Sequence, residues 1–269
     1  MSMNDAPARR MRRQRLYRHD DGRLLVVPLD HPVSSGPIVR DGRIDRLIGQ
    51  IHAGGADAVV LHKGTLRHVQ PRWFRDMSLI VHLSASTALA PDPDAKYLVC
   101  TVEEALRLGA DGVSVHVNAG SREEGRQIAD LAAVAEACDR WGMPLLAMVY
   151  ARGPHIVDGR APAAVAHAAA LAAELGADLV KTALPESPQA IAGITAGCPI
   201  PVLAAGGALT ADPDEALQRL DDAMQCGAGG VAAGRLVFTA AEPAAMVRRL
   251  TSLVHNRAQA PLQRAGDPR

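Results

Sequence analysis

Eight short apolar segments recur along the chain, and each is followed by a longer segment with helical periodicity. Most of the apolar segments are continuous rather than alternating, which is typical of parallel strands covered on both faces. We expect strands over residues 24–30, 57–62, 79–85, 112–118, 144–150, 178–184, 201–207 and 230–235. A regular repeat of strand and helix leaves few architectures open.

The segments between the strands carry helix start and stop signals. "TVEEALRLGAD" begins with Thr and "PAAVAHAAALAAELGAD" with Pro, and both end in Gly-Ala-Asp just before a strand. Eight such units without a boundary linker predict an α/β chain folded as a single (β/α)8 TIM barrel. The alternative is a doubly wound open sheet, which usually carries a GxGxxG fingerprint after its first strand, whereas this strand runs into "PLDHPVS".

We expect the barrel domain over residues 21–256, preceded by a basic arm or lead-in helix over 1–20 and followed by a flexible tail over 257–269. The run "RRMRRQRLYRH" at 9–19 has two interpretations. It is either an RNA-binding arm or organelle transit peptide, or a helix that packs on the barrel or a neighbouring subunit with its arginines in solvent. We favour the helix, because a charge run is usually a solvated face. The tail carries few large apolar groups, as loose chain ends do.

The charge balance and the cysteines argue against several classes of protein. The 29 Lys and Arg residues match 29 Asp and Glu residues, so we expect no nucleic-acid partner, since such binding needs a concentrated basic surface. No run of about 18 apolar residues occurs, and no apolar segment follows the basic start, so we expect a cytoplasmic protein without a membrane partner. The four cysteines form no CxxC pair, which predicts neither a disulfide framework nor a zinc site.

Lysine is rare in this chain, because only Lys63, Lys96 and Lys181 are lysine among the 29 basic residues. A guanidinium stays protonated, whereas a lysine amine taken out of water can lose its proton and attack a carbonyl. Lys181 lies among apolar neighbours in "DLVKTAL", where an ammonium is costly unless it is paired or deprotonated. We therefore predict that Lys181 forms a Schiff base with a ketone or aldehyde. For Lys63 we favour a bridge to carboxylates at the barrel mouth.

Other polar residues gather where the strands end, at the face where barrel enzymes hold their reactive groups. Asp30 and His31 end the first strand, and Tyr150 and Arg152 end or follow the fifth. An iminium on Lys181 would need an acid and a base nearby, and Asp30 and Tyr150 are the candidates. On spacing alone, a structural hydroxyl is an equal alternative for Tyr150.

The strand histidines keep two other functions open. For His62, His82 and His116 we favour hydrogen-bonded structural roles, but together with His31 they could hold a divalent ion in a metal-dependent aldolase or hydrolase. We favour no metal and no cofactor, because no tight pair of histidines with a carboxylate occurs and the lysine would have no role. A third possibility is a barrel that binds phosphosugars without catalysis.

Glycines after the last two strands predict a phosphate site. Gly206 and Gly207 follow the seventh strand, and Gly234 and Arg235 follow the eighth. In this fold the same two loops hold phosphate through backbone N–H groups that only glycine lets approach so closely. Arg235 would add a charge-assisted contact.

The chain resembles the archaeal-type class I aldolases, a family that includes the DhnA-like fructose-bisphosphate aldolases and the 2-amino-3,7-dideoxy-D-threo-hept-6-ulosonate synthases. The resemblance runs from about residue 13 to about 255 and rests on these stretches: "VVPLDHPVSSGP", "VVLHKGTLRH", "LIVHLSASTALAPDP", "VEEALRLGADGVSVHVNAGS", "WGMPLLAMVYARG", "VAHAAALAAELGADLVKT" and "GVAAGRLVF". It implies the barrel fold, a Schiff-base mechanism without a cofactor, and a large ring-based homo-oligomer such as a decamer.

The resemblance also implies roles for single residues. Lys181 would be the Schiff-base lysine, Tyr150 the proton donor and Asp30 the proton acceptor. The predicted substrate-binding residues are His31, Pro32, Val33, Ser34, Ala151, Arg152, Gly206, Gly207, Gly234 and Arg235.

Three departures from the family pattern bear on the substrate. The family usually has glycine where Pro32 stands, proline where Ala151 stands, and Pro-Lys where Ala208 and Leu209 stand. Losing that lysine removes a cation near the predicted phosphate. Because the family also includes an aldolase of aminohydroxybenzoate pathways, we favour dihydroxyacetone phosphate as donor and aspartate semialdehyde as acceptor, with the transaldolase-type synthase and fructose-bisphosphate aldolase reactions as alternatives.

Overall fold

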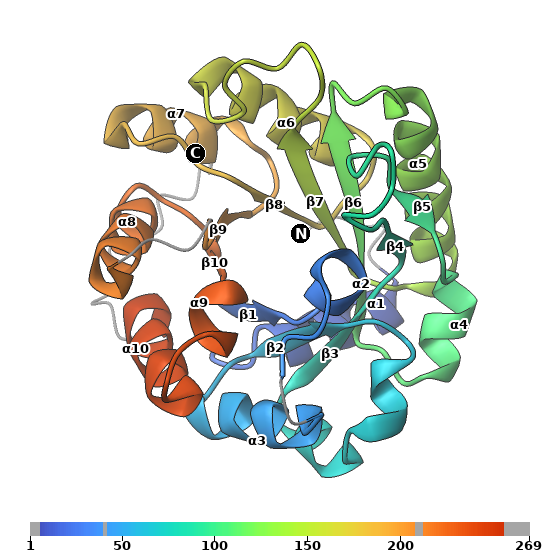
Figure 1. Cartoon of the computed structure of the whole chain (residues 1–269), viewed down its shortest axis with the longest axis vertical. Helices are drawn as coiled ribbons and strands as arrows, with labels where there is room; N and C mark the ends of the chain where they lie inside the picture. The colour runs from blue at the N-terminus through green and yellow to red at the C-terminus, as the bar shows by residue number, and fades with distance from the viewer. Residues whose placement is uncertain (1–5, 40–41, 208–211, 256–269) are drawn as a thin grey trace, which may run out of the picture.

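The computed structural model describes residues 6–39, 42–207 and 212–255. Within these ranges eight parallel strands close into a barrel in the order β1-β10-β9-β8-β7-β6-β3-β2. Figure 1 shows this ring of strands with helices around its outside. The predicted TIM barrel is confirmed, and the open-sheet alternative is wrong, because β1 pairs with β10 and leaves no free edge.

Each barrel strand coincides with one of the eight apolar segments to within one residue at its start, and six of the eight are shorter than the segment. The strands are β1 (Leu24–Pro28), β2 (Ala58–Leu61), β3 (Ser78–His82), β6 (Gly112–Ala119), β7 (Leu145–Ala151), β8 (Leu179–Thr182), β9 (Val202–Ala205) and β10 (Gly230–Ala232). Most of them end early because the residues that follow turn away from the sheet and build the barrel mouth. There lie two short antiparallel strands, β4 (Ser84–Ala85) and β5 (Tyr97–Leu98), which the apolar pattern did not distinguish.

The helices begin and end where the sequence signals place them. Those outside the barrel are α3 (Ile44–Gly54), η1 (Thr65–His68), η2 (Pro71–Arg75), α4 (Val102–Arg107), α5 (Glu124–Trp141), α6 (Pro162–Glu174), α7 (Pro188–Gly197), α8 (Pro213–Gln225) and α10 (Pro243–His255). The Thr101 hydroxyl accepts the N–H of Glu104 and caps α4, and α5 ends at Gly142 in the left-handed conformation. None of the helices in the described ranges is long and apolar enough to cross a membrane.

Two apolar cores explain why the strands read as continuous apolar runs. Leu24 and Val26 point into the barrel, whereas Leu25 and Val27 of the same strand pack against the helices outside. Side chains alternate between the two faces of a strand, so a strand buried on both faces needs apolar residues at every position. The inner core also receives Leu16, at the end of helix α1 (Pro7–Leu16), which is 1% exposed.

Helix α1 covers the end of the barrel where the strands begin, and Arg9 and Arg12 are partly buried, whereas Arg10, Arg13 and Arg15 are exposed as expected. Three aspartates that precede strands accept backbone N–H groups there: Asp57 from Leu25 (2.7 Å), Asp111 from Leu79 (3.0 Å) and Asp178 from Leu145 (2.8 Å). Each also pairs with an arginine from the lead-in segment: Arg18 (3.1 Å), Arg15 (2.9 Å) and Arg9 (3.4 Å), respectively. Buried carboxylates need such partners, which is why these arginines turn inward.

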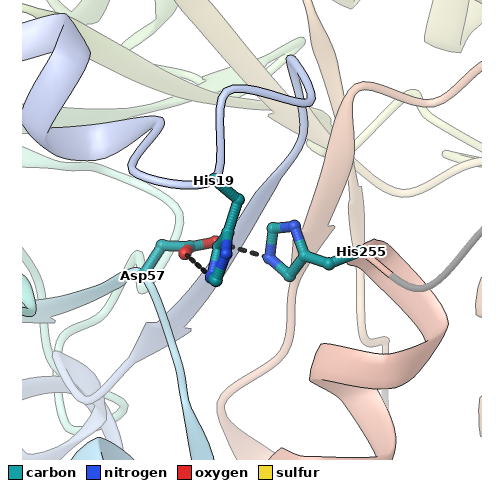
Figure 2. A group of neighbouring side chains, drawn as sticks. All are labelled: His19, Asp57 and His255. Carbon is teal, nitrogen blue, oxygen red and sulfur yellow. Dashed lines mark hydrogen bonds and ion pairs between the residues drawn. The ribbon is translucent and has the colours of Figure 1, made fainter.

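At the same end, Asp57 joins the lead-in segment to the last described helix. Figure 2 shows His19 and His255 converging on its carboxylate, at 3.4 Å and 2.9 Å. The other ring nitrogen of His255 bonds to Asp21 at 2.7 Å. Burial alone would lower the pKa of His255, but its contacts with Asp57 and Asp21 outweigh burial and raise the pKa above its ordinary value.

Candidate active site

The interior face of the barrel changes from apolar to polar toward the carboxyl ends of the strands. On β8, Leu179 belongs to the inner core, and Lys181 two residues later points the same way. On β7, Met148 pairs with Lys181 across the sheet, so Tyr150 lies on the same face one layer closer to the mouth. The strand periodicity thus brings the predicted lysine and phenol together.

Two cavities open at this mouth, and Lys181 and Tyr150 line both. The first, which we name the histidine cavity, has a volume of about 320 Å³ and is lined among others by Asp30, His62, His82, Lys96 and His116. The second, the glycine cavity, has a volume of about 580 Å³ and is lined among others by Gly153, Gly159, Gly206, Gly207 and Gly234. A molecule attached to Lys181 can therefore extend in two directions.

Asp30 lies in the loop that leads from β1 into the short helix α2 (His31–Ser35), and its carboxylate lines the histidine cavity. Burial alone would raise the pKa of this carboxyl, but its interactions with His82, Lys181 and His31 outweigh burial and hold the pKa below its ordinary value. One oxygen of Asp30 and the Nδ1 of His31 are buried 3.7 Å apart without a hydrogen-bond partner among the described residues. Asp30 is thus an ionised carboxylate with one oxygen that no described residue bonds.

Tyr150 is held by two neighbours. Its ring lies 5.1 Å from the ring of His116, and the guanidinium carbon of Arg152 lies 4.7 Å from its centre. His116 is in turn fixed by Asn118: the Asn118 amide donates to the carbonyl of Asp94, so its oxygen faces His116 and accepts the N–H of Nε2 at 2.9 Å. Tyr150 therefore packs against a histidine that hydrogen bonds hold in place through Asn118 to Asp94.

The strand histidines are uncharged at neutral pH. Burial lowers the pKa of His82 to about 4, and His82 bonds to the Ser114 hydroxyl at 2.7 Å. Burial also lowers the pKa of His62 and, well below its ordinary range, that of His116. The favoured structural interpretation is confirmed for His82 and His116, which have hydrogen-bond partners.

Close backbone contacts account for the glycines after β9 and β10. A Cβ at Gly234 would lie 2.2 Å from the carbonyl oxygen of Pro28, and one at Gly206 would lie 2.9 Å from the Cβ of Ala233. Gly207 has a φ of +72°, which side chains other than glycine rarely adopt. Arg235 begins the short helix α9 (Arg235–Phe238) and lines both cavities.

Comparisons with known proteins match this geometry. A family model for DeoC/LacD family aldolases matches residues 24–240. A 2-amino-4,5-dihydroxy-6-oxo-7-(phosphonooxy)heptanoate synthase of Streptomyces griseus is 57% identical over 95% of this chain and 93% of its own length. The chain belongs to the DeoC/LacD family of aldolases.

Two further relatives narrow the kind of aldolase. A 2-amino-3,7-dideoxy-D-threo-hept-6-ulosonate synthase of Halobacterium salinarum is 46% identical over 91% of this chain and 92% of its own. A solved archaeal fructose-1,6-bisphosphate aldolase, described with its catalytic lysine covalently bound to the carbinolamine intermediate of the substrate, superposes with a TM-score of 0.83 at 27% identity, covering 92% of this chain and 99% of that one. The expected class I aldolase is confirmed.

The other predicted substrate-binding residues of the aldolase divide between the cavities. His31, Val33 and Ser34 line the histidine cavity, and His31 also lines the glycine cavity together with Ala151. Arg152 lines both. Pro32 shares helix α2 with these residues but lines neither cavity. The departures at Ala208 and Leu209 lie outside the described residues.

Sequence reasoning missed two residues of the aldolase that reach the mouth. Asp94 and Lys96 line the histidine cavity from the segment between β4 and β5. The rarity of lysine was the available signal for Lys96, but nothing in the sequence indicates where this segment folds. Lys63, by contrast, pairs with Glu104 at 3.0 Å, as predicted.

The strand histidines of the aldolase do not converge as metal ligands. Within the described ranges, one group of three side chains brings its ligand atoms close enough for an ion, namely His19, Asp57 and His255 at the opposite end of the barrel. The oxygens of Asp57 already accept N–H groups from Arg18 and Leu25. This group is therefore an ion-paired network without a free carboxylate oxygen for a cation.

Proposed function

We propose that this aldolase joins dihydroxyacetone phosphate to aspartate semialdehyde through a Schiff base on Lys181. The observation that carries the proposal is the position of Lys181 between a glycine-lined cavity and a polar one. The name of the Streptomyces griseus relative describes an aldol product, with a hydroxyl on carbon 4 and a ketone on carbon 6. Breaking the bond between carbons 4 and 5 of that compound gives aspartate semialdehyde and dihydroxyacetone phosphate.

The reaction begins at the donor ketone. The neutral amine of Lys181 attacks the carbonyl carbon, and loss of water gives an iminium that makes the hydroxymethyl carbon beside it acidic. Asp30 accepts the proton released from that carbon, which leaves an enamine. The enamine attacks the aldehyde carbon, Tyr150 protonates the new alkoxide, and water then releases the product and restores the amine.

The glycine cavity suits the donor phosphate. Backbone at Gly206, Gly207 and Gly234 can approach an anion without hindrance from side chains, and Arg235 supplies a charged donor at the same cavity. These features support a donor phosphate bound on one side of Lys181, with the aldehyde in the histidine cavity on the other.

Reductive trapping tests the proposal. Borohydride added with dihydroxyacetone phosphate should attach the donor to Lys181, and peptide mass spectrometry would identify the residue. Lys181→Ala should lose both the label and turnover while keeping its circular dichroism spectrum. Full turnover by Lys181→Ala, or a label on another residue, would contradict the assignment of Lys181.

A second candidate is the transaldolase-type reaction named for the Halobacterium salinarum relative. The name of that product lacks a 7-phosphate and indicates a 7-deoxy sugar, so the two reactions give products of different mass. Offering both kinds of donor with aspartate semialdehyde, and weighing the product by mass spectrometry, distinguishes them. A fructose-bisphosphate aldolase would instead take glyceraldehyde 3-phosphate as the acceptor.

We also propose that the enzyme works in the cytoplasm as a homo-oligomer. The cysteines of the described chain, Cys100, Cys138, Cys198 and Cys226, are free thiols, which fits a reducing compartment. Apolar side chains such as Tyr97 and Trp141 are exposed and would be available to a subunit interface. Light scattering on the purified chain tests the assembly, and a monomer would contradict it.

A further inference from the structure

Lys96 lines the histidine cavity but has no role in the proposed mechanism. It follows residues 86–95, which connect β4 to β5. In Figure 1 β4 lies beside β6 and β5 beside α5, so the segment runs along the rim on that side. Lys96 lines the histidine cavity together with Asp30, Tyr150 and Lys181.

The ammonium group of Lys96 is held in place by its own segment. Its Nζ donates to the Ser86 hydroxyl and, at 3.2 Å, to the carbonyl of Pro93. The segment is tied to the barrel at the Asp94 carbonyl, which accepts from Asn118 of β6 at 2.9 Å and from Gln127 of α5 at 3.2 Å. The cation is therefore positioned before any ligand arrives, which lowers the entropic cost of binding.

Lys96 and Arg152 place two cations at one cavity. Among the described residues, neither has a carboxylate oxygen within 4.0 Å, and the guanidinium of Arg152 donates no side-chain hydrogen bond. Burial lowers the pKa of Lys96, and the charge of Arg152 lowers it further. An anion bound between them would relieve this repulsion.

The proposed product has two charged ends that need separate sites. Its ketone carbon, carried by Lys181 during the reaction, lies next to the carbon that bears the phosphate, whereas the carboxylate and the amine lie on carbons 1 and 2 at the far end of the chain. With the phosphate in the glycine cavity, the amino-acid end extends into the histidine cavity. Asp94, whose side chain lines both cavities, is the carboxylate available there for the amine.

We propose that Lys96 and Arg152 bind the carboxylate of an α-amino-acid aldehyde in the histidine cavity, and that Asp94 binds its ammonium group. This inference rests on the proposed function and specifies which residues select the acceptor. Charged hydrogen bonds lost from such a site weaken binding about tenfold to a hundredfold each. The acceptor is thus recognised by its amino-acid end and the donor by its phosphate.

Three acceptor aldehydes, each tested with dihydroxyacetone phosphate as donor, distinguish recognition of the carboxylate from recognition of the ammonium group. Aspartate semialdehyde carries both charged groups, succinate semialdehyde only the carboxylate, and propanal neither. Lys96→Met should raise the KM for the first two about tenfold or more and leave kcat/KM for propanal unchanged. Asp94→Asn should raise the KM for aspartate semialdehyde alone. Lys63→Met, which removes the lysine paired with Glu104 at the same end of the barrel, is the matched control and should behave as the wild type.

The outcomes distinguish this inference from the proposed function. Equal losses with all three acceptors in Lys96→Met would mean that Lys96 only shapes its segment, and no loss with any acceptor would mean that it does not contact them; either result overturns the inference. Borohydride trapping of dihydroxyacetone phosphate should remain normal in Lys96→Met. A wild type that labels Lys181 but turns over none of the semialdehydes would refute the proposed acceptor, and the inference with it.

Discussion

At the scale of single residues, the reacting groups of this aldolase are controlled by burial. Burial keeps His82 and His116 uncharged, whereas interactions with neighbours such as Lys181 outweigh burial and keep Asp30 ionised in the same cavity. The proposed catalytic pair of Asp30 and Tyr150 therefore lies in a cavity whose histidines are neutral and whose charges come from lysine, arginine and aspartate side chains.

Replacing Tyr150 with Phe tests its role as proton donor. The ring and its contacts with His116 and Arg152 would remain, so the fold and the Schiff base should be preserved. Loss of the hydroxyl should lower kcat by about 10² to 10⁴. The measurement pairs steady-state kinetics with borohydride trapping. Normal turnover would remove Tyr150 from the mechanism and restore the structural interpretation of its hydroxyl.

Replacing Arg235 with Ala tests the phosphate site. Loss of a charged donor should raise the KM for dihydroxyacetone phosphate about tenfold to a hundredfold and change kcat less. Arg219→Ala is the control, because Arg219 pairs with Glu215 on the outer helix α8 at 3.6 Å. If both variants have the wild-type KM, the phosphate binds elsewhere.

At the scale of secondary-structure elements, helix α1 has two unlike faces. Leu16 fills the end of the inner core at 1% exposure, whereas Met11 is 69% exposed on the same helix. Arg9 and Arg15 of the helix pair with Asp178 and Asp111, two of the aspartates that precede strands. The helix is thus part of the core of the barrel, although the charge run from which it was predicted resembles a solvated arm.

Leu16→Ala should therefore destabilise the protein. Truncating a buried leucine costs about 2 to 5 kcal/mol, since it leaves a cavity. Met11→Ala, an exposed change in the same helix, should alter the free energy of unfolding by no more than about 0.5 kcal/mol. Denaturant unfolding of both variants checks the difference, and equal effects would show that α1 does not close the barrel.

Most secondary-structure elements of the barrel could be predicted from the sequence, but one segment at the mouth could not. The eight strands were predictable because each is buried on both faces, and Lys181 and Tyr150 because strand periodicity fixes where they point. The segment from Ser86 to Lys96 was not, since β4 and β5 have two residues each and no apolar run. Its position depends on Asn118 and Gln127, whose partners lie 24 and 33 residues away.

At the scale of the whole molecule, Asp57 connects the first and last described segments of the chain. Arg18 and His19 reach it from the lead-in segment and His255 from the end of α10, while Asp21 fixes the second nitrogen of His255. Arg18, His19 and Asp21 are thus charged or titratable neighbours of the Asp57 and His255 pair. Their arrangement predicts a stability that depends on pH.

Because its pKa is raised above 6.5 in the folded state, His255 stabilises the protein fully below that value. The contribution is lost as pH rises through the folded pKa. Between about pH 6 and about pH 9, the wild type should lose more stability than His255→Gln, which cannot titrate. Urea unfolding at both pH values measures this, and parallel losses in the two proteins would contradict it.

The strands of this barrel carry their reacting groups at one end and their aspartate, arginine and histidine pairs at the other. Substitutions at one end of the barrel should consequently change catalytic activity, and substitutions at the other end should change stability. A variant selected to survive alkaline conditions can be altered around Asp57 without retuning its acceptor preference, and a variant selected for a new aldehyde can be altered around Lys96 without weakening the seam between β1 and β10.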